Sequence, residues 1–236
     1  SGMLPGFVAG HYEVPDLGIV LVRLARFAGA RLILGRASGI DLDARSVTVE
    51  GRPPLRFDLA SIDIGISSEM PGLPGFAEHA VPAKPLDTFA RRWAAFAGSG
   101  EAGRVAVIGG GIAGMEIALA AAYRLRGRGS VTVVEAGKVL SATGGAARRA
   151  ILSRAAELGV TVIEGAPAAS VGPEGVRLAD GRVVPSDFTV GAAATRPQGW
   201  PAATGLHLTD GFVTVGPTLQ TSDPAIFATG DIAHMR

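Results

Sequence analysis

The stretch VAVIGGGIAGMEIALAA, residues 105–121, constrains the fold more than any other part of the chain. A run of strand-forming residues leads into Gly109, Gly111 and Gly114, which form a G-x-G-x-x-G motif, and a helix is predicted over 112–126. The first glycine allows a tight turn, the second lets backbone approach a pyrophosphate, and the third lets the helix pack closely on the strand. The helix N-terminus presents free N–H groups and a partial positive charge to phosphates. The motif therefore predicts a dinucleotide-binding turn.

Acidic residues near the motif indicate which dinucleotide is bound. Glu135 ends the next predicted strand, SVTVVEA, 21 residues after Gly114. A carboxylate at this position accepts hydrogen bonds from ribose hydroxyls and repels a 2′-phosphate, which favours NAD(H) over NADP(H), although Lys138 can soften that preference. Glu116, in the predicted first turn of the helix, has two interpretations that the sequence leaves open. It either interacts favourably with the helix dipole or lines the nicotinamide pocket.

The elements around the motif alternate between strand and helix. After the second strand come a helix over 145–158, a third strand GVTVIEG, a hairpin GVRLADGRVVPS with an Asp-Gly turn, and a closing strand DFTVGAAAT. This β-α-β-α-β order predicts an α/β domain built on a parallel sheet, which we place at residues 100–196. A structural glycine turn that binds no ligand remains the alternative.

The segments before and after this domain are rich in short strands. Residues 17–28 have the apolar spacing of a buried helix face, with Asp16 at the expected N-cap and Gly29 at the expected end. Strands are predicted at ARLILG, at SVTVEG and twice within LRFDLASIDIGISS, followed by a Pro/Gly hinge, EMPGLPGF, and an amphipathic helix over 86–97. The C-terminal part reads as a strand, a Ser-Asp-Pro turn, a short strand and a Gly-Asp pair. The predicted α/β domain is thus flanked by β-rich segments on both sides.

Composition excludes several classes of function. The chain has 236 residues, 47% hydrophobic and 18% charged, as expected for one or two globular domains. It contains no cysteine, which excludes disulfides, thiolate zinc sites and a redox-active cysteine pair. A net charge of +1 with scattered basic residues argues against a nucleic-acid partner. The four histidines are far apart in the sequence and no G-x-S-x-G elbow occurs, so we expect neither a metal site nor a hydrolase triad.

The hydropathy pattern gives an expectation about location. No apolar run reaches the length of a membrane span, and the first residues lack the features of a secretory signal. We expect a cytoplasmic protein, with peripheral membrane attachment of a longer parent protein left open.

Together these motifs resemble those of the two-dinucleotide-binding-domain flavoproteins, the FAD/NAD(P)-binding pyridine nucleotide-disulfide oxidoreductase superfamily. VIGGGIAGMEIA is similar to the NAD signature of that family, and LQTSDPAIFATGD to its late FAD signature. The second match implies that Gly230 and Asp231 contact the ribityl or phosphate region of the flavin. The opening GMLPGFVAGHY and the segment AKPLDTF look closest to type II NADH dehydrogenase-like proteins, including the module fused to selenide, water dikinase. The resemblance implies a Rossmann-like NAD-binding domain inserted into an FAD-binding domain.

The chain also departs from the pattern of that family. The family opens with a strand, a glycine turn and a helix that hold FAD, whereas this chain starts after that unit and stops five residues after Asp231. We therefore expect a fragment in which residues 1–99 and 197–236 form an incomplete FAD domain around the NAD domain at 100–196. The expected consequences are an intact NAD site, weak or absent FAD binding, and an orphan apolar surface that is buried in a homodimer.

The resemblance implies an NAD(P)H-dependent FAD oxidoreductase. Hydride would pass from NADH to flavin and on to a quinone-like or other small-molecule acceptor, and the absence of cysteine removes the thiols of the disulfide-reductase branches. His11 and Tyr12 are expected to pack or face solvent rather than to approach the acceptor. The alternative is an NAD(H)-binding module without turnover, or a partner domain of a fused enzyme.

Overall fold

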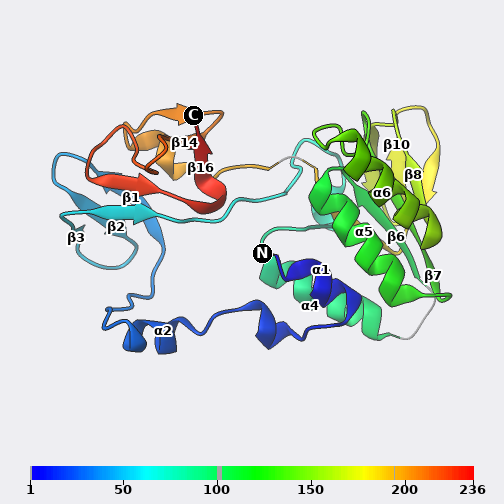
Figure 1. Ribbon diagram of the computed structural model, residues 1–236, viewed down its shortest axis with the longest axis horizontal. Helices are drawn as coiled ribbons and strands as arrows, with labels where there is room; N and C mark the ends of the chain where they lie inside the picture. Colours follow the sequence, from blue (N-terminus) through cyan, green and yellow to red (C-terminus); the bar gives the residue numbers. More distant parts are fainter. Residues whose placement is uncertain (1, 100–102, 194) are drawn as a thin grey trace. The chain divides into compact units, whose positions relative to one another are not determined.

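The computed structural model describes residues 2–99, 103–193 and 195–236, and the chain divides into two compact units (Figure 1). Unit 1 comprises Ser1–Gly18 and Ser68–Thr195, and unit 2 comprises Ile19–Ser67 and Arg196–Arg236. Each unit therefore combines segments that are far apart in the sequence.

Unit 1 is built on a five-stranded sheet in which every strand runs parallel to its neighbours. Parallel strands need crossover connections. Helices on one face of the sheet connect the strands that follow one another in the sequence from Ala80 to Ile163. In spatial order the strands are β5 (Ala80–Pro82), β12 (Phe188–Gly191), β6 (Gly103–Ile108), β7 (Gly129–Val134) and β8 (Val160–Ile163).

Different layers cover the two faces of this sheet, because successive side chains of a strand point to opposite sides. Val105 and Val107 of β6 pack with the main helices, whereas Ala106 and Ile108 pack with a short helix and a small antiparallel sheet. The main helices are α1 (Leu4–Ala9), α4 (Leu86–Gly98), α5 (Ile112–Leu125) and α6 (Gly145–Glu157); a 3-10 turn, η1, spans Val14–Leu17. The opposite face carries α3 (Phe76–His79), β9 (Ala168–Gly172), β10 (Gly175–Leu178) and β11 (Val183–Pro185).

The structure confirms the elements predicted around the glycine motif. Helices α5 and α6 end one residue earlier than predicted, and the Asp-Gly hairpin forms β10 and β11. Strand β9, which pairs with β10, and edge strand β5 were not predicted. Both are short, and sequence periodicity is weakest for short strands.

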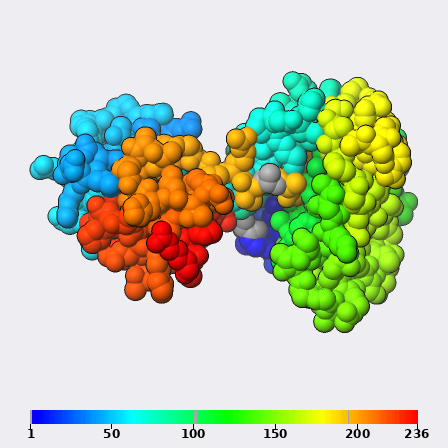
Figure 2. Space-filling model, turned by 90° about the horizontal axis from the view of Figure 1, so that it is seen from above, coloured from blue at the N-terminus to red at the C-terminus, as the bar shows by residue number. Residues whose placement is uncertain are grey.

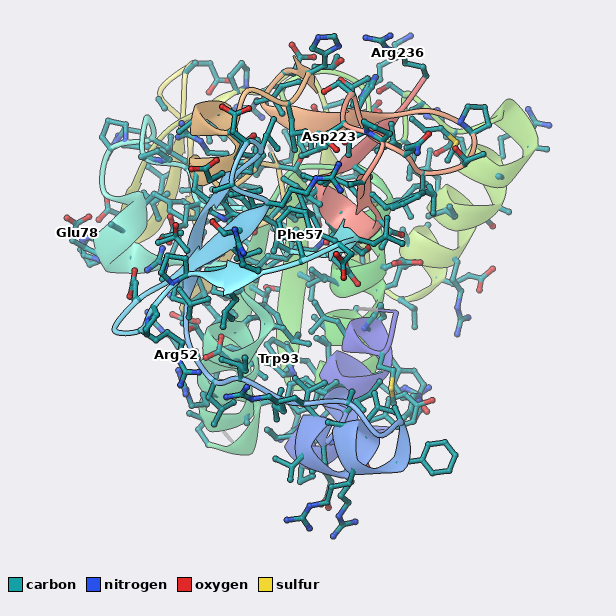
Figure 3. The ribbon with its side chains drawn as sticks, turned by 90° about the vertical axis from the view of Figure 1, so that its left-hand side faces the viewer. Arg52, Phe57, Glu78, Trp93, Asp223 and Arg236 are labelled. Carbon is teal, nitrogen blue, oxygen red and sulfur yellow. The ribbon has the colours of Figure 1, made fainter. Side chains whose placement is uncertain are left out.

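The unit boundaries differ from the predicted segments. Within the expected flanking segment 1–99, residues 1–18 and 68–99 pack with unit 1. Helix α4 joins the N-terminal segment to unit 1. Its Trp93 (labelled in Figure 3) is 2% exposed, and the Nε1 of Trp93 donates a hydrogen bond to the Val8 carbonyl oxygen in α1 at 3.1 Å. Flanking segments thus complete the helical layer of the parallel sheet.

Unit 2 contains several small sheets around one core. Figure 2 shows its two segments, blue and orange to red, lying against each other. The core includes Ile62, Val213, Ile226 and Ile232. The strands are β1 (Ala37–Asp41), β2 (Ser46–Val49), β3 (Leu55–Arg56), β4 (Ala60–Ile62), β13 (Leu208–Thr209), β14 (Phe212–Val215), β15 (Ile226–Ala228) and β16 (Ala233–Met235), with helix α2 (Leu21–Phe27) and 3-10 turns η2 (Trp200–Ala203) and η3 (Gly230–Ile232).

The predicted buried helix at 17–28 is wrong in its start and in its burial. Helix α2 begins at Leu21 with Val20 as N-cap, and Asp16 instead accepts a hydrogen bond from the N–H of Glu13 in the preceding turn. The apolar side chains of α2 are exposed, and Phe27 reaches 91%. Apolar periodicity identifies the face that can be buried, but burial requires a second surface to cover it.

The predicted end of this helix is confirmed. Gly29 adopts φ +62°, its N–H bonds the Arg26 carbonyl, and the N–H of Ala30 bonds the carbonyl of Ala25, which is the pattern of a Schellman cap. The predicted strand at ARLILG, residues 30–35, is wrong, because these described residues form no strand. Its β-forming side chains favour a strand only where a neighbouring strand pairs with it.

Candidate functional site

The glycine motif follows β6 at the carboxyl end of the parallel sheet. Gly109 adopts φ +110°, a conformation that side chains disfavour. A β-carbon there would lie 2.5 Å from the backbone nitrogen of Ala193, just after β12. The turn therefore requires glycine for its backbone conformation and for its close approach to the neighbouring strand.

The other two glycines of the motif serve different purposes. A β-carbon on Gly114, in the first turn of α5, would collide with the carbonyl oxygen of Gly109, so glycine here allows the helix to pack on the strand end. Gly111 is the N-cap of α5, is exposed, and would place a β-carbon in open space. Packing within the described residues does not account for glycine at position 111, whereas close approach of a phosphate would. The turn thus fits a pyrophosphate at the N-terminus of α5.

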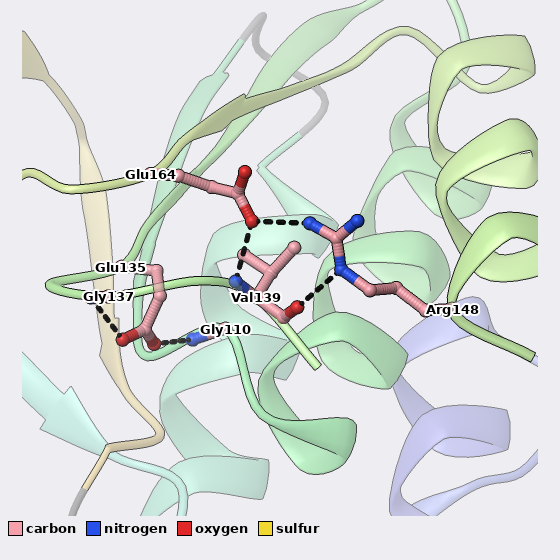
Figure 4. A network of polar contacts seen from close by, with 6 residues as sticks. All are labelled: Gly110, Glu135, Gly137, Val139, Arg148 and Glu164. Carbon is pink, nitrogen blue, oxygen red and sulfur yellow. Dashed lines mark hydrogen bonds and ion pairs between the residues drawn. The ribbon is translucent and has the colours of Figure 1, made fainter. Parts of the chain in front are cut away.

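Glu135, immediately after β7, is joined to this turn (Figure 4). Its Oε2 accepts a hydrogen bond from the N–H of Gly110 at 2.7 Å, and its Oε1 accepts one from the N–H of Gly137 at 2.9 Å. The side chain is half-buried. An ionised carboxylate offers about four acceptor positions, so two bonds to backbone leave capacity for ribose hydroxyls.

The sheet order independently marks the same place. From β6 the chain crosses to β7 and β8 on one side, whereas β12 and β5 lie on the other side. Gly109 after β6 and Ala192 after β12 therefore border the point at which the strand order reverses. Open α/β sheets bind ligands at the carboxyl ends of the strands at such a point.

Sequence reasoning did not identify a second polar group beside this turn. Glu164, directly after β8, accepts hydrogen bonds from the N–H of Val139 and from Nη2 of Arg148, both at 2.7 Å, and Nε of Arg148 donates to the Val139 carbonyl at 2.9 Å (Figure 4). The Val139 N–H, together with Arg148, holds the pKa of the Glu164 carboxyl below its usual range, against the effect of burial. The sequence does carry a signal for Glu164, because it ends the third predicted strand just as Glu135 ends the second.

Glu116 lies further along the helix than predicted. It is the fifth residue of α5, past the first turn, and its side chain is exposed. The interaction of a charge with the helix dipole falls off within the first turn, so that interpretation loses its support. A role of Glu116 in the nicotinamide pocket stays a prediction.

The residues that the resemblance assigns to FAD lie in unit 2. Gly230 and Asp231 follow β15, and both are exposed. Gly230 adopts φ +68°, and a β-carbon there would collide with the carboxylate of Asp63, which follows the parallel partner strand β4. These residues thus gather at the carboxyl end of a parallel pair, the edge at which nucleotides bind in α/β folds.

Three further observations bear on other kinds of site. His11 packs against Tyr123 of α5 with ring centroids 5.3 Å apart, and Arg126 lies over the same tyrosine ring. Among the described residues, no three His, Asp or Glu side chains are grouped to hold a metal ion. The described helices include none with the length and apolar character needed to cross a membrane.

Known proteins resemble this chain in sequence and in fold. The chain is 31% identical over 234 residues to a protein named probable ferredoxin reductase CtmF from Castellaniella defragrans, covering 96% of this chain and 56% of that protein. It is 33% identical over 210 residues to the ferredoxin–NAD(+) reductase component of the biphenyl dioxygenase system of Paraburkholderia xenovorans, covering 84% and 49%. The crystal structure of a ferredoxin reductase from Rhodopseudomonas palustris shares the fold, with a TM-score of 0.79 at 24% identity over 90% of this chain and 53% of that one.

These similarities confirm the expected fold class, a mixed α/β fold of Rossmann-like type. The chain spans about half the length of the curated relatives that it matches. Residues 24–236 match the model of a family described as pyridine nucleotide-disulphide oxidoreductase. The chain belongs to this family of oxidoreductases.

Proposed function

We propose that unit 1 binds the adenosine diphosphate half of NAD(H), and that the chain serves an NADH-dependent flavin oxidoreductase. The observation that carries this proposal is the glycine turn itself. Gly111 leaves open space at the N-terminus of α5, and Glu135 stands beside it at the point where the strand order reverses. No packing contact within the described residues requires glycine at position 111.

Each residue of the site has a defined task. The turn and the first N–H groups of α5 bind the pyrophosphate, and Glu135 accepts hydrogen bonds from the adenosine ribose. The negative charge of Glu135 favours NAD(H) over NADP(H), because a 2′-phosphate would lie beside it, while exposed Lys138 weakens that preference. Glu116 borders the nicotinamide. NADH, when bound, supplies the hydride that reduces a flavin.

Unit 2 supplies the flavin side of the proposed enzyme. Gly230 and Asp231 would contact the ribityl or phosphate region of FAD at the carboxyl end of β15. We propose that the chain by itself holds FAD weakly. Strands β4 and β15 pair over only three residues each, and such a small sheet positions few groups around a large cofactor.

The names of the relatives support a proposal for the electron acceptor. Two of them are ferredoxin reductases by name, and a third is the FlRd–NAD(+) reductase of a nitric oxide reductase system. We propose that the parent enzyme passes electrons to a small redox protein of the ferredoxin type. A quinone-like or other small-molecule acceptor is the alternative outcome.

The proposed activity is tested by absorption spectroscopy. The purified chain is mixed with excess FAD, desalted, and scanned before and after addition of NADH. We expect saturable NADH binding and little retained flavin. Flavin that remains after desalting and bleaches with NADH would contradict the weak binding of FAD and establish a working reductase, in which ferredoxin and a soluble quinone can then be compared as acceptors. A chain that binds NADH but shows no perturbed flavin spectrum even in excess FAD, before desalting, would favour the alternative, an NAD(H)-binding module without turnover.

We further propose that the exposed apolar segment 19–34 mediates self-association. Ile19 is 75% exposed, Phe27 91% and Leu34 78%, and water-exposed apolar surface of this kind favours contact with a second copy. Light scattering coupled to size-exclusion chromatography should give a dimer that Phe27→Ser weakens. Leu59→Ser, at a residue that is 70% exposed outside the segment, is the matched control. A monomer at all concentrations would contradict the proposal.

A further inference from the structure

The peptide groups on both sides of Val139 are held by side chains from two different elements. The Val139 N–H donates to Glu164 after β8, and the Val139 carbonyl accepts from Nε of Arg148 in α6. Glu164 and Arg148 also bond each other at 2.7 Å. The three groups form a closed set in which the backbone donor and the backbone acceptor of one residue each have a charged partner (Figure 4).

Val139 lies directly against the glycine turn. Its side chain is fully buried, and a β-carbon on Gly110 would collide with it. The next residue, Leu140, donates its N–H to the Gly110 carbonyl oxygen at 2.8 Å. Gly110 is therefore held on one side by Glu135 and on the other by the segment that Val139 anchors.

Leu140 shows that this arrangement is held under strain. It adopts φ +55°, a left-handed conformation that is uncommon for a residue with a side chain, and it is 2% exposed. Such a conformation persists only where the surroundings determine it. Three features fix the conformation of Leu140: its burial, its bond to Gly110, and the bonds of Glu164 and Arg148 to the backbone of the preceding residue, Val139.

We infer that Glu164 and Arg148 are positioning residues for the dinucleotide, which hold segment 136–140 against the glycine turn so that Gly110 and Glu135 are in place before the nucleotide arrives. The inference rests on the proposed function, because it assigns a role at the same site. We place neither residue in contact with the nucleotide, because both act through the backbone of Val139.

The contacts distinguish this role from that of a surface ion pair. The side chains of Arg148 and Glu164 are 30% and 38% exposed, against 54% and 57% for Arg154 and Glu157 at the end of the same helix. Glutamate can accept from an N–H but an arginine cannot, and arginine can donate to a carbonyl but a glutamate cannot. Exchanging the two charges would restore the ion pair and remove both bonds to Val139.

The first test measures the affinities of NADH and ADP-ribose by calorimetry, with urea unfolding in parallel. We expect Glu164→Ala to weaken both ligands by the same factor, about tenfold, because a hydrogen bond to a charged group positions the site. Glu164→Gln should lose less, since its amide oxygen still accepts from Val139. Arg154→Gln is the matched control and should bind as the wild type does. Unchanged affinity in Glu164→Ala would overturn the inference.

The second test uses the charge exchange Glu164→Arg with Arg148→Glu. We expect the double variant to bind NADH no better than Glu164→Ala. Recovery of wild-type affinity would show that only the ion pair matters and would overturn the positioning role. If Glu164→Ala fails to fold, Arg148→Gln takes its place, with a smaller expected loss of affinity, because Glu164 still accepts from Val139. A wild-type chain that binds neither ligand would overturn the proposed function itself, and the inference with it.

Discussion

The carboxylate of Glu135 accepts a hydrogen bond from the backbone N–H of Gly110 at 2.7 Å, so the acid at the end of β7 holds the turn at the end of its neighbour β6. The turn and the acid are therefore one structural unit before any nucleotide binds. Pre-organised groups spend less binding free energy on ordering, which suits a site that must hold a flexible dinucleotide.

Two of the motif glycines should separate binding from stability. Gly111→Ala places a methyl group in open space, so the free energy of unfolding should change by less than about 0.5 kcal/mol, whereas NADH affinity should fall at least about tenfold. Gly114→Ala forces a methyl group onto the Gly109 carbonyl and should cost about 1–3 kcal/mol of stability as well. Urea unfolding and calorimetric titration measure both effects. Normal NADH binding by Gly111→Ala would contradict the proposal that the pyrophosphate binds at this turn.

Glu135 should determine the choice between the two nicotinamide dinucleotides. Glu135→Gln removes the negative charge that repels a 2′-phosphate while it keeps one acceptor oxygen for Gly110. The ratio of NADPH affinity to NADH affinity should therefore rise. Glu157→Gln makes the same change of charge at the end of α6 and should leave the ratio as it is. An equal ratio in both variants would contradict the assignment of Glu135.

Asp187 should contribute to the loss of folding stability at acidic pH. Its hydrogen bonds from the Arg104 side chain hold the pKa of the Asp187 carboxyl below its usual range, with burial opposing the shift. A carboxyl whose pKa is lowered in the folded state stabilises the fold at pH values above its ordinary pKa, about 3.9. This contribution is lost as the pH falls through the folded-state pKa. Unfolding free energies measured from pH 7 to pH 3 should fall less steeply in Asp187→Asn than in the wild type. Parallel curves would show that the pair contributes nothing to stability.

Trp93 should contribute to the stability of unit 1. Trp93→Phe leaves the Val8 carbonyl without its partner in the buried helical layer, at a cost of about 1–3 kcal/mol. Trp200→Phe, at a half-buried tryptophan of unit 2, is the control, and unfolding is followed by calorimetry so that the two units are seen separately. If Trp93→Phe leaves the unit 1 transition unchanged, residues 1–18 are not an integral part of that unit.

Local sequence predicted the centre of unit 1 because each signal there has a local physical cause. The buried apolar run before Gly109 and the glycine turn that begins the helix after it are both local signals, and the predicted strand and helix are both found. Helix α4 could be predicted equally well, because Phe89 and Trp93 repeat on one face of the helix and that face is buried.

Long-range features were not accessible in this way. Residues 17–28 have the pattern of a buried helix, but no local signal shows whether another surface covers it. The pairing of β5 with β12 joins residues about a hundred positions apart, so the place of β5 in the parallel sheet could not be predicted from sequence. The bonds of Glu164 and Arg148 to Val139 depend on how helix α6, the end of β8 and the loop after β7 meet, and the residue types alone do not specify that geometry.

We propose above all that the turn at Gly109–Gly114, with Glu135, binds the adenosine diphosphate half of NAD(H). Calorimetric titration of the wild-type chain with NADH, repeated in the presence of saturating ADP-ribose, tests it most directly. We expect saturable binding of one NADH per chain, which ADP-ribose abolishes by competition. Binding that persists with ADP-ribose present, or no saturable binding at all, would contradict it.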